Sequence, residues 1–321
     1  MLAPLLAVLV LAVLVLAVLV LASCAAPVTT PVGHRPFYGL NEPNASLSRE
    51  RQLSRDVGVR PTVFSAFIRL DTTTTAQKMT AMHAAGLTPF ITLEPWHLGA
   101  RNGVPDPRDS LRHLLAGEFD AQLLEQARML ATYKAPFYLR FAHEMNAGWY
   151  PWGIGVDGNT AADYVRSWRH VHQLFDHVPG LHARWVWSPV AVQNPGASSE
   201  LAPLYPGDDV VDYVGLTGYE HADAQPAATF DPTITRLHAL THLPIVLSEI
   251  GSDGKDKTTW LAALGTYLRT HPGIAGFVYF DTSPASTGAT GTYSLDDATE
   301  RAAFARGLRA LRPSPSGKDR P

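Results

Sequence analysis

The segment Phe137-Tyr-Leu-Arg-Phe-Ala-His-Glu-Met-Asn146 is followed by three large aromatic residues in Trp149-Tyr-Pro-Trp152. Its first half is a short apolar run, which is typical of a strand buried in a parallel sheet. Its second half places a histidine and a glutamate directly after that run. The segment therefore predicts a buried strand that carries a carboxylic acid at its carboxyl end.

Seven other runs of this kind occur between residues 36 and 311, and helix-like segments separate most of them. The eight predicted strands are residues 37–41, 63–70, 89–94, 137–143, 183–188, 211–218, 244–249 and 274–280. The predicted helices are residues 46–57, 72–85, 110–133, 160–177, 258–269 and 298–311. The segments after the fifth and sixth strands show no clear helical pattern.

This alternation predicts an α/β protein built as a single (β/α)8 TIM barrel, because eight β/α units in about 275 residues match that fold. A doubly wound open sheet is the alternative. It is disfavoured because no glycine-rich phosphate loop follows the first strand. No second domain and no internal repeat of about 20–50 residues is visible.

The N-terminal segment differs from the rest of the chain. Residues 1–22 are Met-Leu-Ala-Pro followed by an almost pure Leu, Ala and Val run, and Leu21-Ala-Ser-Cys24 closes it. This pattern resembles the lipobox of a bacterial lipoprotein, in which the cysteine carries lipid after cleavage, and Cys24 is the only cysteine. An uncleaved membrane anchor and ordinary secretion are the alternatives. All three place the remaining chain outside the cytoplasmic membrane.

The expected organisation is a lipoprotein-type signal or anchor at residues 1–24, a linker at 25–35, a catalytic domain at 36–311 and a disordered tail at 312–321. One cysteine permits no intramolecular disulfide, so the core must hold the fold. The formal net charge of −3 and the pI near 6.5 provide no basic field for nucleic acid. The 13 histidines are scattered without metal-ligand spacing. We therefore expect no metal site. We also expect no organic cofactor, and we expect the protein to be a monomer.

Polar and aromatic residues gather at the predicted carboxyl ends of the strands, where barrels of this kind place their reactive groups. They are Asn41, Glu42, Glu94, Trp96, His97, His143, Glu144, Trp187, Tyr219, Glu220, Glu249 and Asp281. Carboxylic acids beside aromatic rings suit chemistry on sugars, since an acid protonates the glycosidic oxygen and rings stack on the apolar sugar faces. The pattern therefore indicates a carbohydrate-active site.

Two of these carboxylates stand out. Glu144 ends the fourth predicted strand, and Glu249, in Leu243-Pro-Ile-Val-Leu-Ser-Glu-Ile-Gly251, ends the seventh. Strands four and seven face each other across a barrel mouth. A separation of roughly 5–5.5 Å would allow one carboxylate to act as nucleophile and the other as acid/base, with retention of configuration. The alternatives are a Glu144 that only ends a strand and a Glu249 that caps the next helix.

With these residues identified, the chain resembles glycoside hydrolase family 26, a family of β-mannanases with some mixed-linkage β-glucanases and xylanases. The matching segments are Ile91–Trp96, Arg140–Asn146 with Trp149–Trp152, Tyr205–Asp208 with Val211–Tyr219, and Pro244–Gly251. They cover most of the predicted barrel. His-Glu, in place of the Asn-Glu found in most of the wider clan, is the most specific feature.

The resemblance implies a role for each matched residue. Glu144 would be the acid/base and Glu249 the nucleophile. His143 would contact the sugar in the −1 subsite, Trp149 would form a wall of that subsite, and Tyr219 would hydrogen-bond the nucleophile. A partly apolar site should raise the pKa of Glu144, while the Tyr219 hydroxyl should help to keep Glu249 ionised.

Other residues have two readings each. Arg140 is expected to point into the barrel, where it either stabilises the charge of Glu249 or fills space as a buried ion pair. Glu94, Trp96 and His97 line negative subsites or have structural roles, and Trp187 is a sugar platform or barrel packing. The chain also departs from the family pattern. Tyr279 and Phe280 stand where the family often has a tryptophan, and Ala147 replaces the usual glycine.

The leading hypothesis is a retaining endo-β-glycanase that hydrolyses a β-1,4-linked polysaccharide, with β-mannan as the expected substrate. A mixed-linkage β-glucanase or xylanase is the alternative within the family. A transglycosylase would use the same two glutamates with a sugar as acceptor. A non-catalytic carbohydrate-binding protein of the cell surface belongs to a different class, and the presence of both carboxylates argues against it.

Overall fold

The computed structural model describes residues 36–42, 46–97, 106–222, 224–283 and 291–311. The predicted signal or anchor with Cys24, the linker at 25–35 and the tail at 312–321 lie outside these residues. Within the described ranges, no helix has the length and apolar character needed to cross a membrane.

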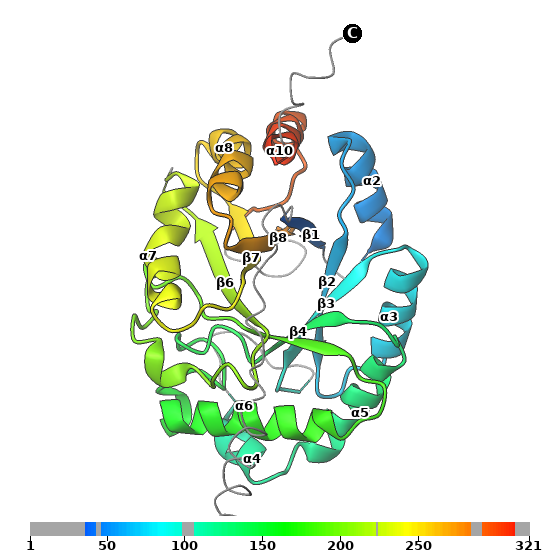
Figure 1. Ribbon diagram of the computed structural model, residues 1–321, viewed down its shortest axis with the longest axis vertical. Coiled ribbons are helices and arrows are strands. Elements are labelled where there is room, and N and C mark those ends of the chain that lie inside the picture. The colour runs from blue at the N-terminus through cyan, green and yellow to red at the C-terminus, as the bar shows by residue number, and fades with distance from the viewer. Residues whose placement is uncertain (1–35, 43–45, 98–105, 223, 284–290, 312–321) are drawn as a thin grey trace, which may run out of the picture.

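Eight parallel strands close on one another in sequence order, from β1 next to β2 round to β8 next to β1 (Figure 1). The predicted (β/α)8 barrel is therefore confirmed, and the open-sheet alternative is wrong. The strands are β1 (Phe37–Asn41), β2 (Val63–Arg69), β3 (Thr88–Glu94), β4 (Phe137–Phe141), β5 (Ala183–Trp187), β6 (Tyr213–Glu220), β7 (Ile245–Ser252) and β8 (Ile274–Phe280).

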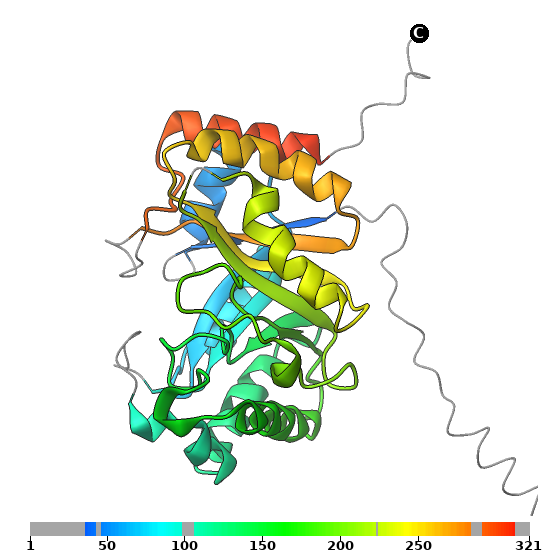
Figure 2. The same ribbon diagram turned by 90° about the vertical axis from the view of Figure 1, so that its left-hand side faces the viewer.

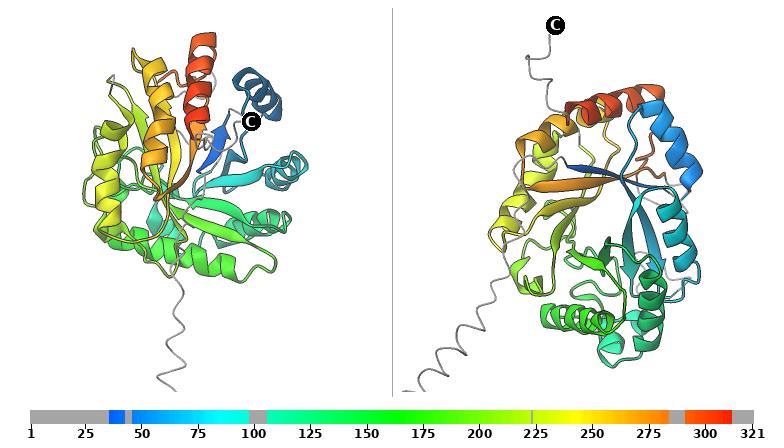
Figure 3. Two further views of the ribbon diagram at one scale, coloured as in Figure 1. Left: turned by 45° about the horizontal axis from the view of Figure 1, so that its top comes forward. Right: turned by 45° about the vertical axis from the view of Figure 1, so that its right-hand side comes forward.

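Helices surround this barrel, as the two views of Figure 3 show. They are α2 (Leu47–Val57), α3 (Thr75–Ala84), α4 (Leu111–Leu115), α5 (Asp120–Ala131), α6 (Ala161–Asp176), α7 (Pro226–His238), α8 (Lys257–Thr270) and α10 (Ala298–Ala310). The single helix predicted for residues 110–133 is wrong, because α4 and α5 are separate and Gly117 between them has a φ of 78°. The connection from β5 to β6 contains one 3-10 turn, Ala202–Leu204, where the other connections have α-helices.

Two apolar layers stabilise the barrel. The inner layer draws on every strand and consists of Phe37, Val63, Phe90, Tyr138, Val186, Tyr213, Val246, Ala275 and Val278. The outer layer packs the helices against the barrel wall and contains most of the buried leucine, phenylalanine and tryptophan side chains. Because the inner layer fills the barrel, ligands can reach only the strand ends.

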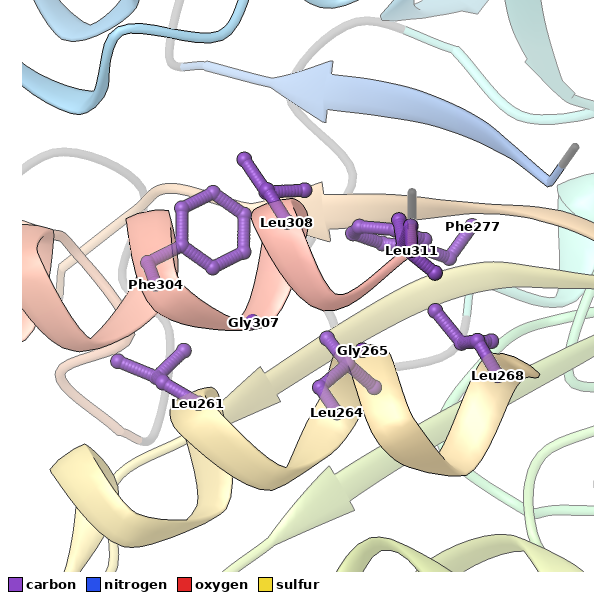
Figure 4. A pocket seen from close by; sticks show the side chains of 9 residues that line it. All are labelled: Leu261, Leu264, Gly265, Leu268, Phe277, Phe304, Gly307, Leu308 and Leu311. Carbon is purple, nitrogen blue, oxygen red and sulfur yellow. The ribbon is translucent and has the colours of Figure 1, made fainter. Parts of the chain in front are cut away.

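Helices α8 and α10 lie side by side along the barrel (Figure 2), and they approach each other closely at Gly265 and Gly307. A Cβ atom at Gly265 would lie 1.7 Å from the carbonyl oxygen of Gly307. Around this contact the side chains of both helices and of Phe277 meet and leave no room for a water molecule (Figure 4). The contact therefore depends on the absence of a side chain at Gly265.

We expect Gly265→Ala to destabilise the fold by roughly 1–3 kcal/mol, because forced overpacking outweighs the gain in helix propensity of about 1 kcal/mol. Chemical denaturation with urea measures the change. Gly273→Ala is the matched control, since a Cβ atom there would come no closer than 3.6 Å to a neighbour, His238. A Gly265→Ala protein as stable as the control would contradict the steric argument.

Candidate active site

The end of β4 has an unusual backbone. The strand stops at Phe141, two residues before the predicted end at residue 143, because Ala142 has a φ of 41° and Glu144 a φ of 57°. Such left-handed conformations cost roughly 1–3 kcal/mol each for residues other than glycine and cluster at functional sites. The neighbouring strand ends hold this turn in place. The Ala142 N–H donates to the carbonyl of Leu93 at 3.1 Å, and the Glu144 N–H donates to the carbonyl of Ser188 at 2.8 Å.

The turn aims the Glu144 carboxyl into a buried setting, where the residue is 6% exposed. The indole N–H of Trp149 donates to its Oε2 at 2.7 Å. Burial first, and then the negative charge of Glu249, raises the pKa of Glu144 to about 7, against the opposing effects of Arg140, Trp149 and Thr217. Glu144 is thus able to hold a proton near neutral pH and to release it, which an acid/base catalyst requires.

A β-bulge positions the second carboxylate. In the register of β6 and β7, Gly215 pairs with Val246 and Thr217 pairs with Glu249. Over this stretch β7 therefore contains one residue more than β6. The register of β7 and β8 shows the same extra residue in β7, because Leu247 pairs with Phe277 and Ile250 pairs with Tyr279. The extra residue in β7 lies next to Glu249, and bulges of this kind redirect side chains beside active sites.

Glu249 lies between a cation and a phenol. The Arg140 Nη2 atom donates to Glu249 Oε2 at 2.5 Å, and the Tyr219 hydroxyl donates to Oε1. Arg140 is fully buried, and its remaining donors bind the hydroxyls of Thr92 at 2.8 Å and Thr217 at 3.3 Å. Of the two roles considered for Arg140, the geometry favours stabilisation of the Glu249 charge, because the guanidinium donates directly to a carboxylate oxygen of Glu249.

Oxygen and nitrogen atoms of His143, Glu144 and Glu249 come within 4.8 Å of one another. Among the described residues this is the group whose atoms could surround a metal ion, and Arg140 already balances the charge of one of its carboxylates. Burial, followed by the Arg140 cation, holds the pKa of His143 well below its ordinary value, so the imidazole is neutral. Its Nε2 atom lies 3.1 Å from the Tyr150 hydroxyl, and its Nδ1 atom has no partner among the described residues.

The aromatic residues after Glu144 divide into two groups. Trp149 is partly exposed and touches the acid, so it is placed to line a ligand site. Trp152 is fully buried, stacks on Tyr150 with ring centroids 4.4 Å apart, and donates from its indole N–H to the His143 carbonyl at 2.7 Å. Trp152 and Tyr150 therefore support His143 from behind.

Glu94 and Trp96 at the end of β3 and Trp187 at the end of β5 were each expected either to bind sugar or to have a structural role. All three are buried. Trp96 is 1% exposed, contacts Tyr150 and Trp152 edge-on, and donates to Glu94 Oε2 at 3.0 Å. Trp187 is fully buried and meets Tyr205 edge-on. These positions favour the structural readings of Glu94, Trp96 and Trp187. His97 is partly exposed and pairs with Asp109 at 2.6 Å.

Two further carboxylates at strand ends hold loops. Glu220 accepts from the N–H groups of Ala222 and Ala224 and from the Ser252 hydroxyl. Asp281 forms an ion pair with Arg49 at 2.9 Å. Neither carboxylate is therefore free to act in the chemistry at Glu144 and Glu249.

Sequence reasoning missed two aromatic residues, Tyr293 and Phe67, which lie beside Tyr219 and His143. Tyr293 stacks on Tyr219 with centroids 4.5 Å apart, Phe280 meets Tyr219 edge-on at 5.9 Å, and Phe67 lies 5.8 Å from His143. Tyr279 is buried, and its hydroxyl donates to the Tyr293 carbonyl. Tyr279 and Phe280 stand where the family often has a tryptophan. Of these two residues, Phe280 is therefore the one that lies beside the site. Phe67 lies within an apolar strand, so its sequence context could not separate it from the core.

Comparison with known proteins supports one family. Residues 106–262 match the model of glycosyl hydrolase family 26. The chain is 28% identical over 201 residues to endoglucanase H of Acetivibrio thermocellus, covering 59% of this chain and 21% of that protein. It is 32% identical over 114 residues to the β-1,3-xylanase TXYA of a Vibrio species, covering 35% of this chain and 23% of that protein.

A solved structure shows the same fold. The family 26 β-mannanase BoMan26A of Bacteroides ovatus superposes with a TM-score of 0.68 at 18% identity, covering 87% of this chain and 90% of that one. The matches span about a fifth of the length of the two curated relatives. The family 26 match covers residues 106–262, and this part of the chain carries both Glu144 and Glu249.

Proposed function

We propose that this protein is a retaining endo-β-glycanase that hydrolyses a β-1,4-linked polysaccharide, with Glu144 as acid/base and Glu249 as nucleophile. The observation that carries the proposal is the approach of the two carboxylates within 4.8 Å in unlike environments. Retaining enzymes separate these groups by about 5–5.5 Å, whereas inverting enzymes need about 6.5–9.5 Å to admit a water molecule.

The first step forms a covalent intermediate. An oxygen of Glu249 bonds to the anomeric carbon while the glycosidic C–O bond breaks, and Glu144 gives its proton to the departing oxygen. Arg140 and Tyr219 hold Glu249 in its attacking position. Trp149 and the neutral His143 border the space in which the sugar must lie.

The second step returns the enzyme to its starting state. Esterification removes the negative charge of Glu249, which is the second cause of the raised pKa of Glu144. Glu144 therefore ionises more readily and takes a proton from water. The water oxygen bonds to the anomeric carbon and the ester bond breaks, with net retention of configuration.

The expected polysaccharide is β-1,4-mannan. The named relatives include an endoglucanase, a β-1,3-xylanase and a β-mannanase. Mixed-linkage β-glucan and xylan are therefore the alternative substrates.

The test is a reducing-sugar assay on mannan, glucomannan, barley β-glucan and xylan, with NMR detection of the anomer first released. β-Anomeric product from mannan supports the proposal, and α-anomeric product contradicts the retaining mechanism. Products longer than the substrate would indicate a transglycosylase. Binding without turnover would indicate a carbohydrate-binding protein.

We also propose that the protein is an extracytoplasmic lipoprotein anchored through Cys24. We expect Cys24→Ser to move it from the membrane fraction to the soluble fraction, because a thioether-linked lipid supplies the anchoring apolar area. Immunoblots of fractionated cells measure this change, and Ser23→Ala is the matched control. Membrane association that survives Cys24→Ser would favour the uncleaved anchor.

A further inference from the structure

Two buried serines meet across strand β6 inside the barrel. Ser188 follows β5 and Ser248 lies in β7, and β6 runs between these two strands. Their hydroxyl oxygens are 2.6 Å apart, so one hydroxyl donates to the other. Ser188 comes two residues after Val186 of the inner layer, and alternate side chains of a strand share one face. The hydroxyl pair therefore lies in the barrel interior, one step nearer the carboxyl ends of the strands than the inner layer.

This contact depends on a glycine in the strand between the two serines. Gly215 of β6 has no side chain, and a Cβ atom there would lie 2.6 Å from Ser188 Cβ and 3.0 Å from Ser248 Oγ. The two serines are 0% and 1% exposed, so water does not compete for their hydroxyls. A hydrogen bond in such a setting is electrostatically stronger than the same bond in water.

Each serine is joined directly to one of the two segments that carry the carboxylates. The Ser188 carbonyl accepts from the Glu144 N–H at 2.8 Å and so holds the left-handed turn, in which Glu144 has a φ of 57°. Ser248 is the residue before Glu249 and lies in the stretch where β7 contains one residue more than β6. The path from Glu144 to Glu249 therefore consists of one backbone hydrogen bond, one pair of hydroxyls and one peptide bond.

We propose that Ser188 and Ser248 are a pair of positioning residues that fix the separation of Glu144 and Glu249. This proposal rests on the proposed function and deepens it. Both carboxylates lie on irregular backbone, which persists only where surrounding contacts hold it. Retention of configuration requires a separation of about 5–5.5 Å, and a misplacement of about 1 Å can cost on the order of 10²-fold in rate. The hydroxyl pair ties one irregular segment to the other.

The kinetic test compares Ser188→Ala, Ser248→Ala and the double variant. We expect each single change to lower kcat on the polysaccharide by roughly 10–10²-fold with KM nearly unchanged, because only the transition-state geometry is lost. Each should also lower the urea midpoint of unfolding, since one buried hydroxyl loses its partner. In the double variant both partners become apolar, which is nearly neutral for stability. The urea midpoint should therefore recover in the double variant, whereas kcat should stay low.

A kcat that recovers together with the urea midpoint would show a merely structural role and overturn the proposal, as would single variants with wild-type kcat. Thr75→Val is the matched control, because Thr75 donates to Gln126 at 2.7 Å in another buried hydrogen bond, between α3 and α5. We expect it to lower the urea midpoint and to leave kcat unchanged. An equal loss of kcat in this control would also overturn the proposal. If the single variants do not fold, the double variant, which leaves neither hydroxyl unpaired, carries the kinetic test.

A titration separates this proposal from the proposed function. Burial, and then the negative charge of Glu249, raises the pKa of Glu144, and Arg140, Tyr219 and Tyr150 are the other ionisable groups coupled to its charge. In the double variant we expect the Glu144 midpoint to fall by roughly half a pH unit for about 1 Å of added separation from Glu249. Carbon-13 NMR of the glutamate δ-carbons measures it, with Glu144→Gln to assign the signal. An unchanged midpoint would overturn the positioning role. A wild-type protein inactive on every glycoside would refute the proposed function, while the titration would still test the serine pair.

Discussion

Glu249→Ala is expected to abolish turnover of the polysaccharide, with a loss on the order of 10⁵-fold or more in kcat, as for removal of other covalent nucleophiles. The reason is that no other described carboxylate is placed to attack. Glu220 and Asp281 are committed to loop N–H groups and to Arg49. The loss is measured as initial rates of reducing-sugar release.

A small anion distinguishes a lost nucleophile from a damaged site. In Glu249→Ala, azide can occupy the vacated space and attack an activated glycoside from the side opposite the leaving group. We therefore expect a glycosyl azide of inverted configuration. Glu249→Gln is the matched variant, because its amide oxygen can still accept a hydrogen bond from Arg140, although that cation loses its anionic partner in both variants. Full activity of either variant on polymer would refute the assigned role.

The barrel could be predicted because its strands are short apolar runs. The first and last predicted strands, residues 37–41 and 274–280, have the bounds of β1 and β8. Helix α7 escaped prediction because Pro226 begins it, Pro232 lies inside it, and it is rich in threonine, all of which weaken a helical pattern. Its packing against the barrel, including buried Phe230 and Ile234, outweighs these local preferences.

The catalytic pair could be predicted because its two glutamates follow apolar strands whose places in the barrel fix which ends face each other. Their orientation could not be predicted. It depends on the left-handed turn at Ala142 and Glu144 and on the bulge beside Glu249, and both are set by hydrogen bonds to neighbouring strands. No local sequence signal encodes a partner carbonyl such as that of Ser188.

The roles of the aromatic residues also depend on contacts far along the chain. Trp96 and Trp149 each follow a strand and a glutamate, so their local sequences look alike. Trp96 is buried against Tyr150 and Trp152, whereas Trp149 remains partly exposed beside Glu144. Burial is a property of the assembled barrel, and sequence alone leaves both readings open.

Glu144→Ala should have a different effect from Glu249→Ala, because a proton donor matters only when the leaving group needs a proton. On polysaccharide we expect a loss of roughly 10²–10⁴-fold in kcat/KM. For a dinitrophenyl glycoside, kcat/KM should change little, while kcat falls because the intermediate waits for an unassisted water. A burst of dinitrophenol in stopped-flow traces measures that accumulation.

The pH dependence follows from the protonation state that each step uses. Glu144 must hold its proton in the first step, and its pKa lies at about 7. Wild-type kcat/KM on polysaccharide should therefore fall as the pH rises through about 7, and kcat/KM on the dinitrophenyl glycoside should not fall with it.

In Glu144→Ala, azide should speed breakdown of the intermediate and give a glycosyl azide of retained configuration, opposite to that from Glu249→Ala. The same azide product from both variants would mean that the two carboxylates do not act on opposite faces of the sugar.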